Sequence, residues 1–324
     1  MTRVPKAVRW SDTVRVPLSG RFLLRRLLQG LLAVWMAVTG AFVFLNATGS
    51  PERLVAPPDA SQEEIDRIAA AYGFDQPLPR QYVDFFVKTF TGSFPDSVNY
   101  HVPAIDVVLD AVPATALLGS VAFVAGNLLG LLIGYVSATS RWWPLRSLPL
   151  GLSRIGHSLP AFYLALLLVI LFSVHLRVLP SAGYGTVENL ILPATVLTIG
   201  VLPGAARLYR AQVLETAGED HVITAVAKGV SRNRVLLRHV GLNALGPALS
   251  LMGIQLGGLI AGAVTIEVIF RWPGVGSMLI DAVNDRDYSV ALTGVLLVAV
   301  AYILATLVTD ILAALVDPLA SRRA

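Results

Sequence analysis

Long apolar runs separated by shorter polar stretches form the dominant pattern of this chain. Six runs lie at about 27–45, 112–136, 148–174, 190–208, 245–270 and 290–314, and each is close to the roughly 20 residues that a helix needs to cross a bilayer. The strands of an outer-membrane barrel would instead show segments of about ten residues with alternating apolar and polar positions. The pattern therefore predicts an all-α polytopic membrane protein with six transmembrane helices.

Prolines interrupt two of these runs. Pro160 ends the segment Ser158-Leu-Pro160 inside the third run. Because proline lacks a backbone N–H and clashes with the preceding turn, we expect a kink there. Pro193 and Pro203 are expected to break the fourth run for the same reason.

Glycines recur at short intervals in the second and fifth runs. The second run carries Gly126, Gly130 and Gly134, and the fifth carries Gly253, Gly257, Gly258 and Gly262. A four-residue spacing places such glycines on one helical face, where another helix can approach closely. We therefore expect these faces to be packing surfaces between helices.

The positive charges are distributed unevenly along the chain. Most of the 25 Lys and Arg residues lie in residues 1–26, in the loop after the second run, between Arg207 and Arg238, or in the terminal pair Arg322-Arg323. Cytoplasmic segments of membrane proteins carry such an excess, so we expect both termini in the cytoplasm. The same rule accounts for the net charge of +4, which therefore does not indicate a nucleic-acid partner.

The runs and charges divide the chain into four parts. These are a basic cytoplasmic tail (1–26), a first transmembrane helix (27–45), a periplasmic segment (46–106) and a core domain (107–324) with five transmembrane helices and a cytoplasmic loop (209–247).

The periplasmic segment 46–106 has helical features of its own. Ser61 and Glu64 form a capping box, and Gly73 can end the helix that follows. The apolar positions of that helix share one face: Ile65, Ile68, Ala69 and Tyr72. A second amphipathic turn carries Val83, Phe86, Val87 and Phe90. We expect a small helical cap, which either packs on the transmembrane helices as a lid or contacts an extracytoplasmic partner.

A short helix is predicted at 220–229 in the cytoplasmic loop. Asp220 can cap its first N–H groups, Lys228 lies in the last turn, and Gly229 can take the left-handed exit. A rod of roughly 12 Å is too short to be stable alone in water, so it must dock on something. Its apolar face is expected to comprise Val222, Ala225 and Val226, ringed by four cations: Lys228, Arg232, Arg234 and Arg238.

The sequence carries few signs of enzyme chemistry. It contains no cysteine and neither a phosphate-binding G-x-x-x-x-G-K-[ST] loop nor a G-x-S-x-G nucleophile elbow. Its five histidines are scattered, so we expect no metal site and no cofactor in this chain. Glu267, near the end of the fifth run, serves either structural hydrogen bonding or gating. We therefore interpret the chain as a passive conduit for a solute, with the energy supplied by another protein. The alternatives are a stand-alone secondary transporter and a membrane scaffold or receptor.

The loop motif resembles that of a known family. The family pattern D-Y-V-x-T-A-x-A-K-G is matched, except at its Tyr, by Asp220, Val222, Thr224, Ala225, Ala227, Lys228 and Gly229, and is followed by Arg238, His239, Asn243 and Pro247. The periplasmic segment 72–82 and the segment 179–184 match family patterns as well. Two further segments also match family patterns. One contains Ser158, Pro160 and Phe162, and the other contains Glu267, Phe270, Pro273 and Gly274. The chain resembles the B-type inner-membrane permease subunits of ABC importers for oligopeptides, dipeptides and nickel.

The resemblance implies a type I ABC-importer permease fold in the bacterial inner membrane. It also implies a second homologous permease, two ATPase subunits that bind ATP and magnesium, and an extracytoplasmic substrate-binding protein. The loop motif would be the coupling helix for the ATPases, and the Ser158–Phe162 and Glu267–Gly274 segments are expected to line the gate or pathway. The solute would be a peptide, nickel, a metallophore complex or glutathione. His221, Ile223 and residues 92–97 depart from the family pattern.

Overall fold

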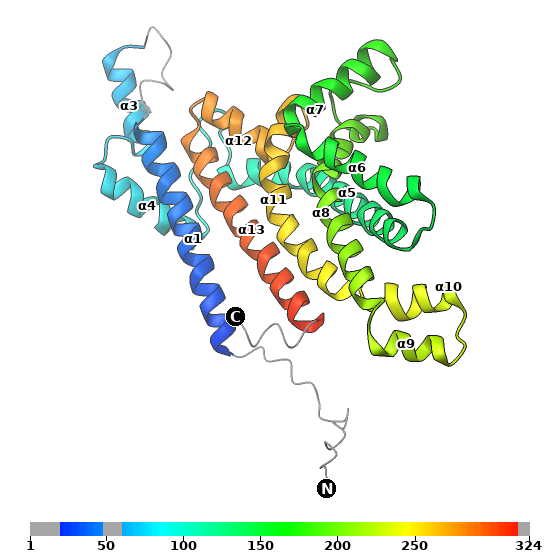
Figure 1. Ribbon diagram of the computed structural model, residues 1–324. Helices are drawn as coiled ribbons and strands as arrows, with labels where there is room; N and C mark the ends of the chain where they lie inside the picture. Colours follow the sequence, from blue (N-terminus) through cyan, green and yellow to red (C-terminus); the bar gives the residue numbers. More distant parts are fainter. Residues whose placement is uncertain (1–19, 48–59, 317–324) are drawn as a thin grey trace.

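The computed structural model describes residues 20–47 and 60–316, and these form a helical protein (Figure 1). The outer part contains α1 (Gly20–Ala47), α3 (Gln62–Tyr72) and α4 (Leu78–Thr91). The central part contains α5 (Ala104–Thr139), α6 (Trp143–Ser158), α7 (Ala161–Leu168), the π-helix η1 (Val169–His175) and α8 (Val187–Thr216). The last part contains α9 (Asp220–Ala227), α10 (Arg232–Arg234), the π-helix η2 (Val235–Gly241), α11 (Leu245–Phe270), α12 (Val275–Asn284) and α13 (Tyr288–Val316).

The helices account for each of the six apolar runs. Among the described residues, 4 helices are long and apolar enough to cross a membrane alone: α1, α5, α8 and α13. Two further pairs qualify as bent spans, α6 with α7 and η1 at 106°, and α11 with α12 at 69°. The count is 6 if each bent pair is one span. The predicted all-α polytopic fold is confirmed.

The bends follow the prolines only in part. Pro160 precedes the first residue of α7, and the chain turns by 106° there, so the predicted kink is confirmed as a sharp break. The predicted breaks at Pro193 and Pro203 are wrong, because α8 continues through both and buries both rings. Neighbouring helices make this possible, since their packing compensates for the hydrogen bond that each proline removes.

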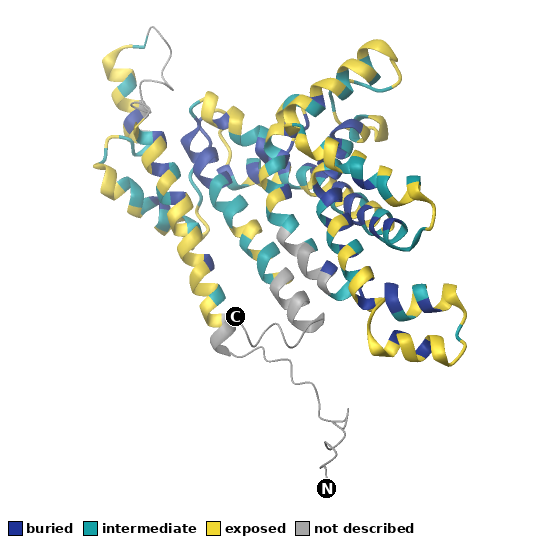
Figure 2. Cartoon of the chain, in the orientation of Figure 1, coloured by how far each residue is buried: buried dark blue, intermediate teal, exposed yellow. Residues whose placement is uncertain are grey.

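The core is formed where α5 crosses α8, and the glycine face predicted on α5 is confirmed. A Cβ added to Gly130 would lie 2.6 Å from the Ala205 Cβ, and one on Gly134 would lie 2.7 Å from the Ala206 carbonyl oxygen. On α11, a Cβ on Gly257 would lie 2.5 Å from the Tyr302 ring, whereas Gly258 meets nothing within 4 Å. Figure 2 shows the buried residues concentrated along α5 and the adjacent part of α8.

The boundaries of the first helix differ from the prediction. The helix α1 begins at Gly20 rather than at 27, so the last residues of the predicted basic tail are helical. Residues 1–19 of that tail and the C-terminal residues 317–324 lie outside the described residues.

The helices predicted between the first and second transmembrane runs are present as α3 and α4, which together are called the cap here. Ser61 caps α3 and accepts a hydrogen bond from the Glu64 N–H, and Gly73 ends the helix at φ 77°, as the sequence indicated. In α4 the predicted apolar positions Val83, Val87 and Phe90 lie on one face of the helix, but they are exposed and do not pack on the transmembrane helices. Phe85 is buried instead, since it fills a hydrophobic cluster between α1, α5 and α13.

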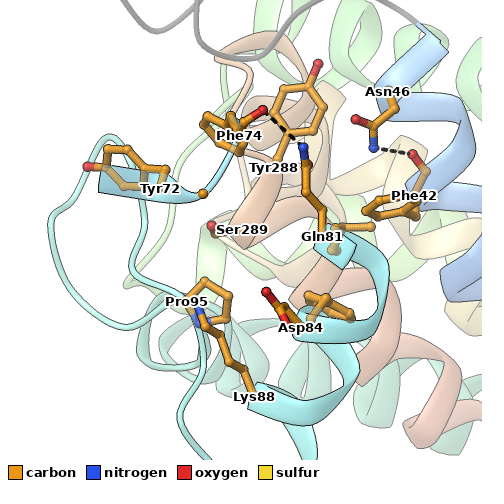
Figure 3. Close-up of a pocket in the computed structure, with 13 residues that line it drawn as sticks. Phe42, Asn46, Tyr72, Phe74, Gln81, Asp84, Lys88, Pro95, Tyr288 and Ser289 are labelled. Carbon is orange, nitrogen blue, oxygen red and sulfur yellow. Dashed lines mark hydrogen bonds between the residues drawn. The ribbon is translucent and has the colours of Figure 1, made fainter. Parts of the chain in front are cut away.

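A pocket of about 90 Å³ separates this cap from the transmembrane helices (Figure 3). Its walls combine Phe42 and Asn46 of α1, the Tyr72–Phe74 turn after α3, and Tyr288 at the start of α13. Gln81 donates hydrogen bonds to the carbonyls of Phe74 and Gln76, at 3.1 and 2.7 Å. These two bonds join α4 to the turn after α3, and the Tyr82 hydroxyl, 2.7 Å from Thr39 Oγ1, is the polar contact that joins the cap to α1.

Candidate coupling hairpin and buried carboxylate site

The predicted cytoplasmic helix forms one arm of a compact hairpin at the lower end of the protein. The helix α9 covers Asp220–Ala227, and α10 and η2 return beside it (Figure 1). The two arms share a hydrophobic cluster that includes Val222, Ala225, Val235 and Val240. The Tyr209 hydroxyl, on α8, donates a hydrogen bond of 2.9 Å to the Gly241 carbonyl and so fixes the hairpin to the long helix.

The end of α9 has the geometry that the sequence predicted. Gly229 adopts φ 78°, and Lys228 is the C-cap residue. The Gly229 N–H donates to Val226 O at 2.9 Å and the Val230 N–H to Ala225 O at 3.2 Å. This is a Schellman motif, in which glycine is favoured because a Cβ is strained at positive φ.

The beginning of α9 differs from the prediction. The N-cap residue is Glu219, and Asp220 is the first residue of the helix with no capping hydrogen bond from its side chain. Asp220 can therefore act only through the helix dipole, which favours a negative charge in the first turn.

The outward face of α9 also differs from the prediction. Val222 and Ala225 are buried against the hairpin's own second arm and cannot meet a partner. Ile223 and Val226 are each 59% exposed, three residues apart on the free side. The cations Lys228, Arg232, Arg234 and Arg238 are also exposed. The hairpin thus exposes two apolar side chains on α9 and four cations between the end of α9 and η2.

A polar network joins the two arms of the hairpin at His221. Its Nδ1 lies 3.0 Å from the Glu219 carboxylate. The Asn243 side-chain amide lies 3.1 Å from His221 Nε2 and donates to His239 O at 2.8 Å. His221 Nε2 also lies 3.1 Å from His239 O, so Nε2 accepts from Asn243 when Nδ1 carries the proton and donates to His239 O when Nε2 carries it. His221 and Asn243 therefore tie the start of α9 to the end of η2.

Among the other motif residues, Thr224 donates to the Asp220 carbonyl at 2.8 Å within α9. Ala227 and Arg238 are exposed. The side chain of Pro247 lies outside the described residues. The structure thus brings all but one of these residues into a single hairpin.

The second candidate site is a carboxylate buried where α11 gives way to α12. Glu267 has no exposed surface. Its Oε1 accepts a hydrogen bond of 2.6 Å from Thr115 Oγ1, and its Oε2 accepts from the backbone N–H groups of Gly276 and Ser277 at 2.7 and 3.2 Å. The Val275 N–H donates to Thr115 Oγ1 at 2.8 Å.

These contacts complete the start of α12. Its N-cap residue, Gly274, has no side chain with which to bond the free N–H groups of the first turn. Glu267 on α11 and Thr115 on α5 accept those bonds from the N–H groups of α12. The structural hydrogen-bonding role that we considered for Glu267 is therefore present.

Close packing around the carboxylate explains two glycines of the P-G-x-G segment. A Cβ added at Gly276 would lie 2.5 Å from Val264 Cα, and one at Gly274 would overlap the Glu267 carboxylate. Trp272 is buried beside them, and its indole N–H donates to the Ala114 carbonyl at 2.8 Å.

The predicted gate residues divide into two groups. Glu267, Phe270 and Gly274 are buried together, whereas Pro273 is exposed. The other three, Ser158, Pro160 and Phe162, are exposed at the bend between α6 and α7. Sequence reasoning did not identify Thr115 or Trp272 as part of the site. Nothing distinguishes Thr115 from other polar residues of an apolar helix, while Trp272 could have been noticed as a bulky residue next to Pro-Gly.

Comparisons with known proteins identify the family of the chain. The family model described as binding-protein-dependent transport system inner membrane component matches residues 126–322, and the model for the N-terminal part of such components matches residues 20–117. The glutathione transport system permease protein GsiC of Escherichia coli (strain K12) is 34% identical over 299 residues, which cover 92% of this chain and 97% of that protein. GsiC of Salmonella typhimurium is 35% identical over the same lengths.

A solved structure shares the fold. The chain resembles a chain of the MetNI methionine ABC transporter in an inward-facing conformation, with a TM-score of 0.56 and 19% sequence identity. The match covers 66% of this chain and 98% of that one.

Proposed function

This chain belongs to the family of binding-protein-dependent transport system inner membrane components, and on that premise we propose that it forms half of a translocation pathway for small peptides. It is a permease subunit of an ABC importer. The finer proposal is that it pairs with a second homologous permease, receives solute from an extracytoplasmic binding protein and is driven by two ATPase subunits. ATP and magnesium would bind to those subunits.

The cytoplasmic hairpin is the observation that carries this proposal. A helix of 8 residues is held on one side by the cluster around Val222 and Ala225, and it exposes Ile223 and Val226 on the other. The exposed Ile223 and Val226, with the cations of the same hairpin, fit a groove that has an apolar floor and acidic residues at its edge. The arrangement is rigid enough to transmit motion, because Tyr209 and the His221–Asn243 network bind the hairpin to α8 and to itself.

A substitution on the free face tests the assignment. Ile223→Asp with Val226→Asp should leave insertion intact but greatly reduce recovery of the ATPase subunits in a pull-down. The control is Ile223→Leu with Val226→Leu, which keeps the face apolar. Full ATPase recovery and full substrate-stimulated hydrolysis in the aspartate variant would contradict a coupling role for α9.

For the solute, we propose glutathione or a peptide of similar size. Support comes from the relatives, which are glutathione permeases. Uptake of labelled glutathione by cells that carry the complete importer, with a dipeptide and a longer peptide as competitors, tests this. The proposal fails if only nickel or a metallophore complex is taken up.

The orientation is also part of the proposal. The basic hairpin, the first residues of α1 and the Arg322-Arg323 pair are placed in the cytoplasm because positive charge accumulates on that side. The cap formed by α3 and α4 then faces the periplasm. Fusions of a reporter enzyme to either terminus would test this topology.

A further inference from the structure

The cap helix α4 carries an apolar stripe on the side that faces away from the rest of the described chain. Val83, Val87 and Phe90 share one helical face, and they are 55%, 54% and 84% exposed. The opposite face is packed, since Phe85 is buried and Tyr82 contacts α1. A helix that is apolar on both sides needs a second apolar environment for its outer face.

The contacts between α4 and α1 fix the depth of this helix. The Tyr82 hydroxyl lies 2.7 Å from Thr39 Oγ1. The Tyr288 hydroxyl, from the first residue of α13, donates to the Leu45 carbonyl, so α13 begins near the level of Leu45. Thr39 precedes Leu45 by six residues, which is about 9 Å along a helix. Figure 1 accordingly shows α4 beside the outer half of α1 rather than beyond its end.

The surface of α1 at this depth is suited to lipid. Val43 and Phe44 are 60% and 62% exposed, and Figure 2 shows exposed residues along most of α1. On α4 itself, Lys88 lines the pocket of Figure 3, whereas Arg80 is exposed next to the apolar stripe. Long cationic side chains in such positions can extend toward lipid phosphates while their stems remain in an apolar layer.

We propose that α4 is an interfacial helix embedded in the outer leaflet, with Val83, Val87 and Phe90 against the acyl chains and Arg80 directed toward lipid headgroups. Helices of this kind bury their apolar face about 5–10 Å below the headgroup boundary, which agrees with the depth derived from Thr39. A binding protein approaching from the periplasm would have to reach below the outer ends of α1 and α13 to cover the same stripe. The interfacial position rests on the membrane family and on geometry, and only the choice of the outer leaflet rests on the orientation given under the proposed function.

The chain has no cysteine, so single cysteines can be labelled without further changes. Val87→Cys and Phe90→Cys are each labelled with a nitroxide in the full-length chain, which is purified with its co-eluting subunits and reconstituted in phosphatidylethanolamine–phosphatidylglycerol liposomes. Power saturation then compares collisions with oxygen, which concentrates in lipid, and with a water-soluble nickel chelate. Val43→Cys on α1 is the lipid reference, and Glu63→Cys on α3 is the water reference.

The expected ratio of oxygen to nickel collisions at positions 87 and 90 matches that at 43 and is several-fold higher than that at 63. Ratios equal to that at 63 would place the stripe in water and overturn the proposal. Low collision rates with both reagents would show that a protein surface covers the stripe, which also overturns it. Two positions are labelled in case one substitution perturbs the fold. A perturbed variant is recognised by its lowered melting temperature, and the other position then gives the result.

Discussion

Thr115 and Glu267 are 152 positions apart in the chain, and the hydroxyl of the first donates a hydrogen bond of 2.6 Å to the carboxylate of the second. Because the same carboxylate accepts two N–H groups at the start of α12, this bond connects α5, α11 and α12 at one point. The bend of 69° between α11 and α12 is therefore held by buried polar contacts as well as by packing.

Replacing the Glu267 carboxyl group with an amide should weaken this connection between α5, α11 and α12. Glu267→Gln is expected to insert and fold but to lose about 1–3 kcal/mol of stability, because the amide cannot accept as well from the N–H groups of α12. We also expect a change in the coupling of transport to ATP hydrolysis. Melting in detergent and hydrolysis with loaded binding protein measure the two effects, and Thr115→Ser, which keeps the hydroxyl, is the control. A melting temperature and coupling equal to those of the parent would leave Glu267 without the role described here.

Two adjacent glycines of α11 offer a matched test of helix packing. Gly257→Leu should displace the Tyr302 ring and weaken the contact between α11 and α13, since even a Cβ at this position would lie 2.5 Å from that ring. Gly258→Leu, one residue later, points into open space in this chain and should be tolerated. Yield of folded protein by size-exclusion chromatography separates them. Equal yields would show that the α11–α13 contact is not as described.

The glycine face of α5 should be equally sensitive. Gly130→Leu places a large side chain against Ala205 and the backbone of α8, so the two helices must separate. Overpacking of this kind commonly costs about 1–3 kcal/mol or more. The comparison is Gly200→Leu on α8, where a Cβ meets nothing within 4 Å. If Gly130→Leu melts and transports like the Gly200 variant, the α5–α8 interface is wrongly placed.

At the end of α9, Gly229→Val should strain the backbone by about 1–2 kcal/mol, because its φ of 78° is unfavourable for a β-branched residue. The variant should insert and pair with the second permease but recover less ATPase. Gly229→Asn is the control, since asparagine tolerates the left-handed region better. If the valine variant recovers the ATPase normally and shows normal stimulated hydrolysis, this segment is an ordinary basic loop and not a coupling helix.

The effect of Asp220→Ala should be smaller than the roughly 1 kcal/mol of a lost N-cap. Asp220 makes no capping hydrogen bond in the structure, so only its interaction with the helix dipole is lost, about 0.3–1 kcal/mol. The same pull-down, carried out at low and high salt, measures this. If the loss of ATPase recovery is as large as that expected for a lost N-cap and persists at high salt, Asp220 acts as an N-cap residue and the geometry described here is wrong.

Local chemistry made several features predictable from the sequence alone. The length of each apolar run determines that it is helical and can span a bilayer, because backbone groups in lipid must bond within their own segment. Glycine at positive φ determines the ends of α3 and α9 at Gly73 and Gly229, since other residues are strained there. The four-residue glycine spacing in α5 similarly identified a face that only another helix could fill.

Other features were decided by the tertiary structure, because they depend on which residue meets which. Val222, Ala225 and Val226 are all apolar residues of one short helix. Val222 and Ala225 are buried because they share a cluster with Val235 and Val240, whereas Val226 remains exposed. The rings of Pro193 and Pro203 are buried within an unbroken α8, which their local preference did not indicate. Thr115 becomes part of the Glu267 site only through the packing of α5 against α11 and α12. Periodicity states that a helix has an apolar side, whereas the contacts of the folded chain determine which side is covered.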